Sequence, residues 1–235
     1  TAQDLGLTTL KDAQSYGLSL ALGSGQAKLT EMTNAYATFA NLGKYNDLTT
    51  ITSITNKDGK TIFTHKAKNK SVISDQTAYI MSSMMSDSSA RSATFGSSLN
   101  LQSQRPAAVK TGTTENYRDA WTIGYTPNLA VGVWIGNNDN TPMSSVAGAS
   151  GAAPIWRSIM NLTLAGTPVQ QFNAPKGLSI RSICRASGAL AQNAGDNTMT
   201  EYFRPGTLPK TSCNETRAPK ASETDVNTNQ SSEQS

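Results

Sequence analysis

The sequence has 235 residues and a formal net charge of +4, and only 15% of its residues are charged. Its lysines and arginines are scattered, and no basic block is interleaved with aromatic residues, which argues against nucleic acid as a partner. No apolar run approaches the length of a membrane-spanning helix, so any export signal or anchor is expected outside this sequence. The length allows one large domain with an appendage.

The N-terminal part predicts a helix followed by a hairpin. The segment KLTEMTNAYATFANLG repeats apolar residues on one helical face and ends at Gly43. The next segment, ITSITNKDGKTIFTH, has two β-branched runs around Asp58 and Gly59, which predicts two strands joined by a tight turn.

Two further helices are predicted, one before and one after the middle of the chain. The first is SDQTAYIMSSMMSD, capped by Ser74, with a face expected to pack in the core that comprises Ala78, Met81, Met84 and Met85. The second is PIWRSIMNLTLAG, opened by Pro154 and ended before Gly166, whose residues expected to be buried are Ile155, Ile159, Met160 and Leu162.

Between these helices the pattern changes to short apolar runs separated by turns. The runs PAAVKTGT, AWTIGYT and LAVGVWIGN follow one another closely, the last two joined by Pro127 and Asn128. They predict three adjacent antiparallel strands, which are largely apolar because helices cover the sheet. Helices before and after an antiparallel sheet make an α+β fold, with the sheet packed between helices.

The C-terminal part predicts a small appendage and a tail. We expect the main domain to cover residues 1–174 and the appendage residues 175–213. The appendage contains both cysteines, Cys184 and Cys213; with no paired histidine or CxxC beside them, a disulfide is favoured over a zinc site, and it indicates an extracytoplasmic location. Residues 214–235 are polar almost throughout and are predicted to be disordered.

The strand that ends in Lys-Thr-Gly-Thr contains the candidate binding and catalytic residues of the sequence. Lys110 supplies a cation, and Thr111 and Thr113 supply hydroxyls that can donate to a carboxylate. Gly112 lacks a Cβ and so lets a substrate backbone approach the strand, while the Thr113 amide can face a developing oxyanion. These groups together suit an extended peptide that ends in a free carboxylate; Thr114 is a further candidate for contact with it.

A simpler interpretation is that Lys110 only extends from a strand end and that the threonines only favour β structure. The loop after the motif contains Arg118 and Asp119, for which we favour a bracing role over substrate contact. His65 is the one histidine of the sequence, so neither a Ser-His-Asp triad nor a histidine metal site is expected, and we expect no metal or other cofactor.

The residues around this motif resemble the transpeptidase domain of the bifunctional, class A penicillin-binding proteins. The segments that carry the resemblance are LALGSGQAKLTEMTNAYATFANLGKY, AVKTGTTENYRDAWTIGYTPNLAVGVWIGNND, GASGAAPIWRSIM, SGALA and EYFRPGTLP. Their order and spacing are similar to the family's up to Cys213. Two departures are visible, since Val109 stands where a glycine is common and Thr122 where a phenylalanine is usual.

The resemblance implies an incomplete penicillin-binding protein/serine β-lactamase-like fold. It also implies cross-linking of D-Ala-D-Ala stem peptides of peptidoglycan through a serine acyl-enzyme, with β-lactams as mimics of that terminus. Lys110 would help the catalytic serines, Thr111 and Thr113 would bind the carboxylate, Gly112 would allow close approach, and the Thr113 amide would form half of the oxyanion hole. An upstream glycosyltransferase domain and an extracytoplasmic place at the bacterial membrane are implied as well.

The nucleophile motif of that family is missing from the sequence. No serine is followed three residues later by lysine, and the S-x-N match at Ser98 to Asn100 lies too close to Lys110 for the family's spacing. We therefore expect the chain to be part of a longer synthase and to be inactive alone. The alternatives are a D,D-carboxypeptidase or β-lactamase-like hydrolase, and a non-catalytic module that binds peptides or β-lactams.

Overall fold

The computed structural model describes residues 1–11, 16–192 and 197–213. The chain divides into two compact units, Thr1–Gly177 and Leu178–Ser235. No helix within the described residues is long and apolar enough to cross a membrane. The predicted disordered tail, 214–235, lies outside these residues, and the boundary expected at residue 175 stays a prediction.

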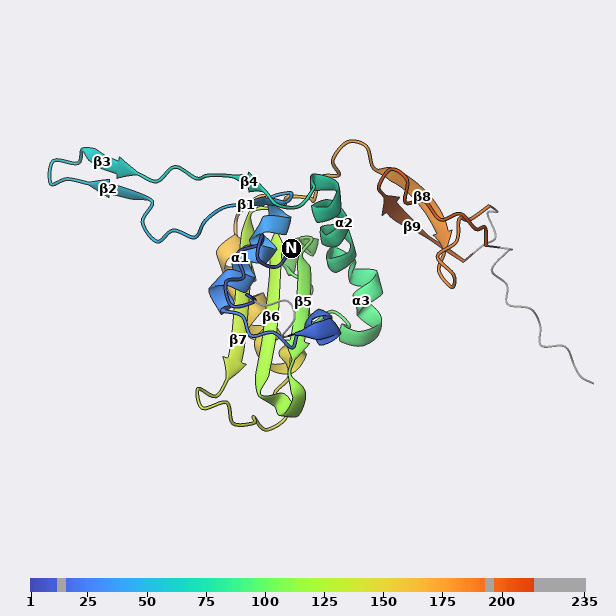
Figure 1. Ribbon diagram of the computed structural model, residues 1–235, viewed down its shortest axis with the longest axis horizontal. Helices are drawn as coiled ribbons and strands as arrows, with labels where there is room; N and C mark the ends of the chain where they lie inside the picture. The colour runs from blue at the N-terminus through green and yellow to red at the C-terminus, as the bar shows by residue number, and fades with distance from the viewer. Residues whose placement is uncertain (12–15, 193–196, 214–235) are drawn as a thin grey trace, which may run out of the picture. The chain divides into compact units, whose positions relative to one another are not determined.

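The first unit is built around a three-stranded antiparallel sheet in the order β5-β6-β7, with β5 at one edge (Figure 1). Its helices are η2 (Gly17–Leu22), α1 (Leu29–Ala40), α2 (Asp75–Ser86), α3 (Ser88–Phe95), η3 (Gln102–Gln104), η4 (Glu115–Tyr117), η5 (Gly148–Ala152) and α4 (Ala153–Leu164). Its strands are β1 (Lys44–Tyr45), β2 (Ser53–Thr55), β3 (Thr61–Thr64), β4 (Lys70–Ser71), β5 (Ala108–Thr113), β6 (Asp119–Thr126) and β7 (Leu129–Gly136). The predicted α+β class and the three adjacent strands are confirmed.

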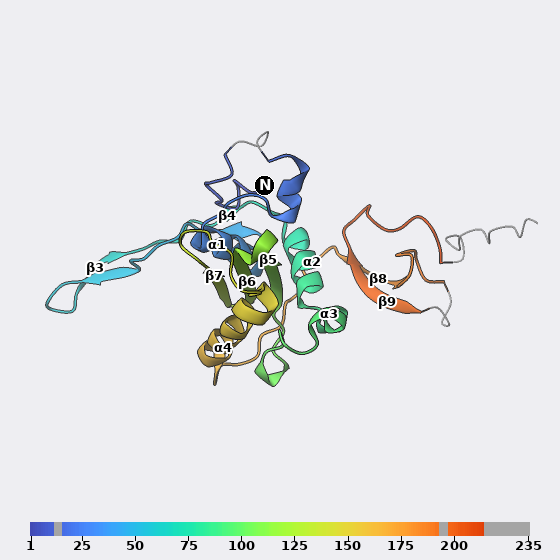
Figure 2. The ribbon, with the colours of Figure 1, turned by 90° about the horizontal axis from the view of Figure 1, so that it is seen from below.

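Helices cover both faces of this sheet, with α1 and α4 on opposite sides in Figure 2. On the α1 side, a Cβ on Gly132 of β7 would lie 2.1 Å from the hydroxyl of Thr33, so helix and strand are in direct contact. On the α4 side, a Cβ on Gly124 of β6 would lie 2.5 Å from the ring of Trp156. Glycines at these two positions therefore set how closely the layers approach.

The buried face of α4 differs from the prediction. Ile155, Ile159 and Leu162 are 46%, 40% and 81% exposed. Met160 is buried as predicted, and the residues buried beside it are Ala153, Trp156 and Leu164. The helix carries two apolar stripes, and the stripe at spacings of three and four that contains the tryptophan packs on the sheet because it removes more apolar area from water.

The other predicted elements of this unit form as expected. Helix α1 ends at Ala40, three residues before Gly43. Strand β2 pairs with β3 around a turn in which Asn56 Oδ1 accepts from the Asp58 and Lys60 amides. Ser74 caps α2 by accepting from the Thr77 amide. The expected burial of Met84 was wrong, because α2 buries the face that carries Ala78, Tyr79 and Ser82 and leaves the Met84 side chain 52% exposed.

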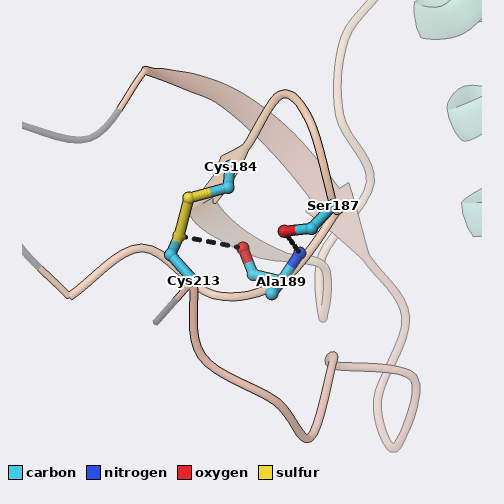
Figure 3. The surroundings of a disulfide bond; sticks show 4 residues. All are labelled: Cys184, Ser187, Ala189 and Cys213. Atoms are coloured by element: carbon cyan, nitrogen blue, oxygen red, sulfur yellow. Dashed lines mark hydrogen bonds between the residues drawn. A yellow bond between two sulfur atoms is a disulfide. The ribbon is translucent and has the colours of Figure 1, made fainter. Parts of the chain in front are cut away.

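The second unit contains a two-stranded antiparallel sheet, β8 (Ser179–Cys184) with β9 (Thr198–Phe203). Figure 3 shows the disulfide between Cys184 and Cys213, whose Cα atoms are 5.9 Å apart. The Cys184 amide donates to the Ala189 carbonyl at 2.8 Å and the Cys213 amide donates to the Leu190 carbonyl at 3.1 Å. The disulfide favoured by the sequence is thus confirmed, and it links the last residue of β8 to Cys213.

Candidate active site

The Lys-Thr-Gly-Thr motif occupies the second half of β5, where the strand passes from the core to the surface. Val109 is buried, whereas Lys110, Gly112 and Thr113 are exposed and Thr111 is half-buried. Arg91 of α3 donates to the Ala107 carbonyl just before the strand, and η5 reaches the second half of the strand through Gly148. The apolar run in the sequence therefore belongs to the buried half of β5, and the motif belongs to the accessible half.

The motif residues alternate between the two faces of the sheet. Val109 pairs with Gly124, which faces Trp156 of α4, so Val109, Thr111 and Thr113 point to the η5 and α4 side. Lys110 and Gly112 consequently point to the α1 side. The cation and the two hydroxyls thus flank the strand from opposite faces, and a ligand that contacts both must lie along its edge.

The free edge of β5 presents backbone groups of this motif. The Thr114 amide donates to the Asp119 carbonyl at 3.0 Å, so residue 114 is hydrogen-bonded toward β6. Since successive residues of an antiparallel ladder alternate between bonding the partner and facing away, the backbone N–H groups of Thr113 and Thr111 face the free edge. The Lys110 ammonium donates to the Thr111 carbonyl at 2.7 Å, in accord with this direction.

Gly112 is a glycine that the chain itself does not require. Its φ angle is not positive, and a Cβ added there would meet one atom within 4 Å, the Cβ of Trp121 at 3.7 Å. That separation is an ordinary van der Waals contact. Packing within the described residues therefore does not account for the absence of a side chain here, and the predicted approach of a substrate backbone stays a prediction.

Thr113 and Thr122 are joined through Gly148, a connection that the sequence did not predict. The hydroxyl of Thr113 accepts from the Gly148 amide at 3.0 Å, and the hydroxyl of Thr122 donates to the Gly148 carbonyl at 3.0 Å. Because 35 and 26 residues separate these partners, no local pattern indicates the contact. Its only trace in the sequence is the glycine-rich stretch before Pro154, which forms the π-helix η5.

Asp119 braces the loop that follows the motif. Its carboxylate accepts from Trp134 Nε1 at 2.8 Å and from the Thr114 hydroxyl at 3.1 Å, and its amide donates back to that hydroxyl at 2.8 Å. Arg118 donates to the Asn140 carbonyl from the same loop. These bonds agree with the bracing role favoured for both residues. They also engage the hydroxyl of Thr114 within the loop, and the contact of Thr114 with a ligand stays a prediction.

The other candidate residues lie apart from this edge. The hydroxyl of Ser98 donates to the Phe95 carbonyl at 2.7 Å, on the loop that ends α3. The described residues contain no group of three or more histidine, cysteine, aspartate or glutamate side chains arranged for a metal ion. The edge of β5 presents the Lys110 ammonium, the Thr113 hydroxyl and outward-facing amides, which are groups that can bind an anion.

Comparisons with known proteins agree with this fold. Residues 5–161 match the penicillin-binding protein transpeptidase domain, and residues 174–218 match the penicillin-binding protein 1A C-terminal domain. The chain belongs to the penicillin-binding protein transpeptidase family, with the class A members as its structural neighbours.

Individual relatives are much longer than this chain. It is 33% identical over 218 residues to penicillin-binding protein 2D of Bacillus subtilis, covering 91% of this chain and 31% of that protein. Penicillin-binding protein 2a of Streptococcus pneumoniae is 33% identical over 224 residues, covering 86% and 30%.

The structure is similar to solved members of the family. The crystal structure of penicillin-binding protein 1A from Haemophilus influenzae gives a TM-score of 0.73 at 22% identity, over 90% of this chain and 36% of that one. PonA1 from Mycobacterium tuberculosis gives 0.65 at 25% identity, over 73% and 50%. The predicted fold is thus confirmed, and the chain spans at most half of any of these relatives.

Proposed function

We propose that this chain forms the substrate-binding part of a peptidoglycan D,D-transpeptidase that works through a serine acyl-enzyme. The observation that carries the proposal is the free edge of β5, with an unoccupied space at Gly112 and the Thr113 amide facing outward. A stem peptide ending in D-Ala-D-Ala would add to this edge as an extended strand, so that its last carboxylate lies beside the motif.

The reaction proceeds by two acyl transfers. A serine Oγ attacks the penultimate carbonyl carbon, the peptide C–N bond breaks, and D-Ala leaves with the proton that the serine gave up. An amine of a neighbouring stem peptide then attacks the ester, releases the serine and forms the cross-link. The Thr113 amide would stabilise the oxyanion of both tetrahedral intermediates.

Lys110 and the two threonines of the motif would bind the negatively charged carboxylate of the ligand. The ammonium of Lys110 is exposed and attracts the carboxylate, while it orients the serine hydroxyls that move the proton. Thr111 and Thr113 would donate hydrogen bonds to the carboxylate. The sequence holds no S-x-x-K, so the nucleophile has to come from outside these 235 residues.

A labelled penicillin tests this function. A relative, PonA1, has been solved in complex with penicillin V, and a β-lactam would acylate the same serine here. The complete protein that contains this chain should give a stoichiometric adduct that survives denaturing electrophoresis, while the 235-residue chain alone should give none. An adduct on the isolated chain would overturn the assignment of the nucleophile, and no adduct on the complete protein would overturn the function.

The sequence encoded before Thr1 separates the rival functions. An S-x-x-K followed by S-x-N in frame supports the enzyme, whereas their absence favours a non-catalytic peptide- or β-lactam-binding module. Within the enzymes, a D,D-carboxypeptidase or β-lactamase would release the acyl group to water instead of to an amine. The match of residues 174–218 to the penicillin-binding protein 1A C-terminal domain favours the synthase.

The same proposal places the enzyme outside the cytoplasm, at the bacterial membrane. The Cys184–Cys213 disulfide is stable in an oxidising compartment, which agrees with that location. A glycosyltransferase domain in the complete protein is proposed from the similarity to the class A members.

A further inference from the structure

We propose that Thr122 is a positioning residue which, through Gly148, fixes the Thr113 hydroxyl for the ligand carboxylate and so sets the preference for ligands with a free carboxylate. The proposal rests on the function proposed above. It concerns a residue of the central strand β6 whose buried side chain points to η5.

The connection consists of two hydrogen bonds through one residue. The Thr122 hydroxyl donates to the Gly148 carbonyl, and the Gly148 amide donates to the Thr113 hydroxyl, each at 3.0 Å. Thr122 is 0% exposed. The first bond is therefore shielded from water, which strengthens it and makes its loss costly to the carbonyl left behind.

Gly148 lies directly on the backbone of β5 and β6. A Cβ at this position would be 2.5 Å from the Trp121 carbonyl oxygen and 2.6 Å from that of Gly112. These are backbone atoms of a paired sheet and cannot move aside. Because Gly148 has no side chain, the main chain of η5 lies close enough to the sheet to bond both threonines.

The bond from Gly148 settles the direction of the Thr113 hydroxyl proton. A hydroxyl has one proton to donate and two lone pairs to accept with. Since the Gly148 amide occupies a lone pair, the proton points elsewhere, and Thr113 is exposed to solvent, so the proton is available to a ligand at the edge. A carboxylate that reaches the edge then finds a donor already oriented, at no cost of ordering.

Thr122 matters to this arrangement because its hydroxyl holds the Gly148 carbonyl. Valine has nearly the same shape but no donor, so Thr122→Val would leave that carbonyl unbonded in the core and free η5 to shift. Thr122→Ser keeps the donor. Thr122→Val therefore removes the hydrogen bond at nearly constant volume, whereas Thr122→Ser reduces the volume and keeps the hydrogen bond.

The experiment compares a penicillin with its methyl ester, which lacks the negative charge. Acylation rate constants of benzylpenicillin and of benzylpenicillin methyl ester are measured on the complete protein, for wild type, Thr113→Val, Thr122→Val and Thr122→Ser. The wild type should prefer the free acid, and Thr113→Val should remove most of that preference. Thr122→Val should lower the acid-to-ester ratio by roughly tenfold, the value of one charge-assisted hydrogen bond, while Thr122→Ser stays within about threefold of wild type.

The outcomes distinguish this inference from the function on which it rests. An unchanged ratio in Thr122→Val, with a collapsed ratio in Thr113→Val, would overturn the inference and leave the function standing. A wild type that neither compound acylates would overturn the function itself. If Thr122→Val does not fold, Thr122→Ala carries the same expected drop. A merely structural role would lower the melting temperature and both rate constants together and leave the ratio unmoved, which would also overturn the inference.

Discussion

The hydroxyl of Tyr125 is hydrogen-bonded to the hydroxyl of Ser82 at 2.9 Å, in the core between β6 and α2. Ser82 also donates to the Ala78 carbonyl, so the tyrosine donates to the serine. Edge-to-face contacts with Tyr36 and Phe172 surround the Tyr125 ring at centroid distances of 6.2 and 5.7 Å. Tyr125 therefore connects α2 and α1 to the strand that pairs with the candidate site.

Removing this hydrogen bond should destabilise the fold moderately. Tyr125→Phe keeps the ring packed and loses only the bond, and Ser82 retains its bond to Ala78. We expect the free energy of unfolding to fall by about 1 kcal/mol, as measured by urea denaturation of the chain. Tyr125→Ala would create a cavity and should cost about 3–5 kcal/mol. Equal effects of the two variants would contradict this account of the residue.

The buried phenol should also make stability fall at alkaline pH. Burial raises the pKa of Tyr125 far above its ordinary value near 10, because the charged phenolate is disfavoured away from water. The stability it contributes is complete below a pH of about 10 and is lost above that, as the phenol ionises in the unfolded chain. Tyr125→Phe should therefore flatten the decline of melting temperature between about pH 10 and 11.5. An identical decline of melting temperature in wild type and Tyr125→Phe would show that ionisation of Tyr125 does not limit stability at alkaline pH.

Two glycines of the sheet should respond oppositely to alanine. Gly112→Ala places a methyl group beside the free edge, so stability should be unchanged or rise by up to about 1 kcal/mol, while acylation by penicillin slows by about tenfold or more. Gly124→Ala forces a Cβ to within 2.5 Å of Trp156 and should cost about 1–3 kcal/mol in stability. Melting temperatures and acylation rates of both variants test this. A Gly112→Ala protein that acylates at the wild-type rate would show that no ligand backbone passes there.

The disulfide should stabilise the second unit alone. A bond that links cysteines 29 residues apart should contribute about 2–5 kcal/mol by restricting the unfolded chain. Thermal unfolding with and without dithiothreitol, and of a Cys184→Ser, Cys213→Ser double variant as the matched control, should show the same loss. Acylation of the complete protein should be unaffected, since the motif lies in the first unit. Stability that is indifferent to reduction would contradict the prediction.

Local patterns in the sequence were sufficient for the elements that are stabilised locally. The helix from Leu29 and the hairpin around Gly59 follow from apolar period and turn residues, and the three strands around the motif follow from runs bounded by turns. The buried face of α4 did not follow, because two apolar stripes compete and only the shape of the sheet decides between them. Helix α3, capped by Asp87, was also missed, although its cap is visible in the sequence.

The candidate site was only half predictable for the same reason. Lys110 and Gly112 are recognisable because residue type and order specify their chemistry. Strand alternation alone places Thr113 and Lys110 on opposite faces, but which face meets η5 and α4 required the register of the sheet. The bond between Thr113 and Gly148 required the return of the chain after 35 residues. Contacts of that kind depend on tertiary packing, which a single sequence does not display.

The rate of acylation by penicillin in the Lys110→Ala variant tests the central claim most directly. The side chain of Lys110 is exposed and its ammonium donates only to the carbonyl of the neighbouring Thr111 among the described residues. Its removal should therefore leave the fold intact. Stopped-flow measurement on the complete protein should show acylation slowed by about a hundredfold or more, with Lys60→Ala, another exposed lysine, at the wild-type rate. A Lys110→Ala rate within a few fold of wild type would contradict the assignment of this strand as part of the active site.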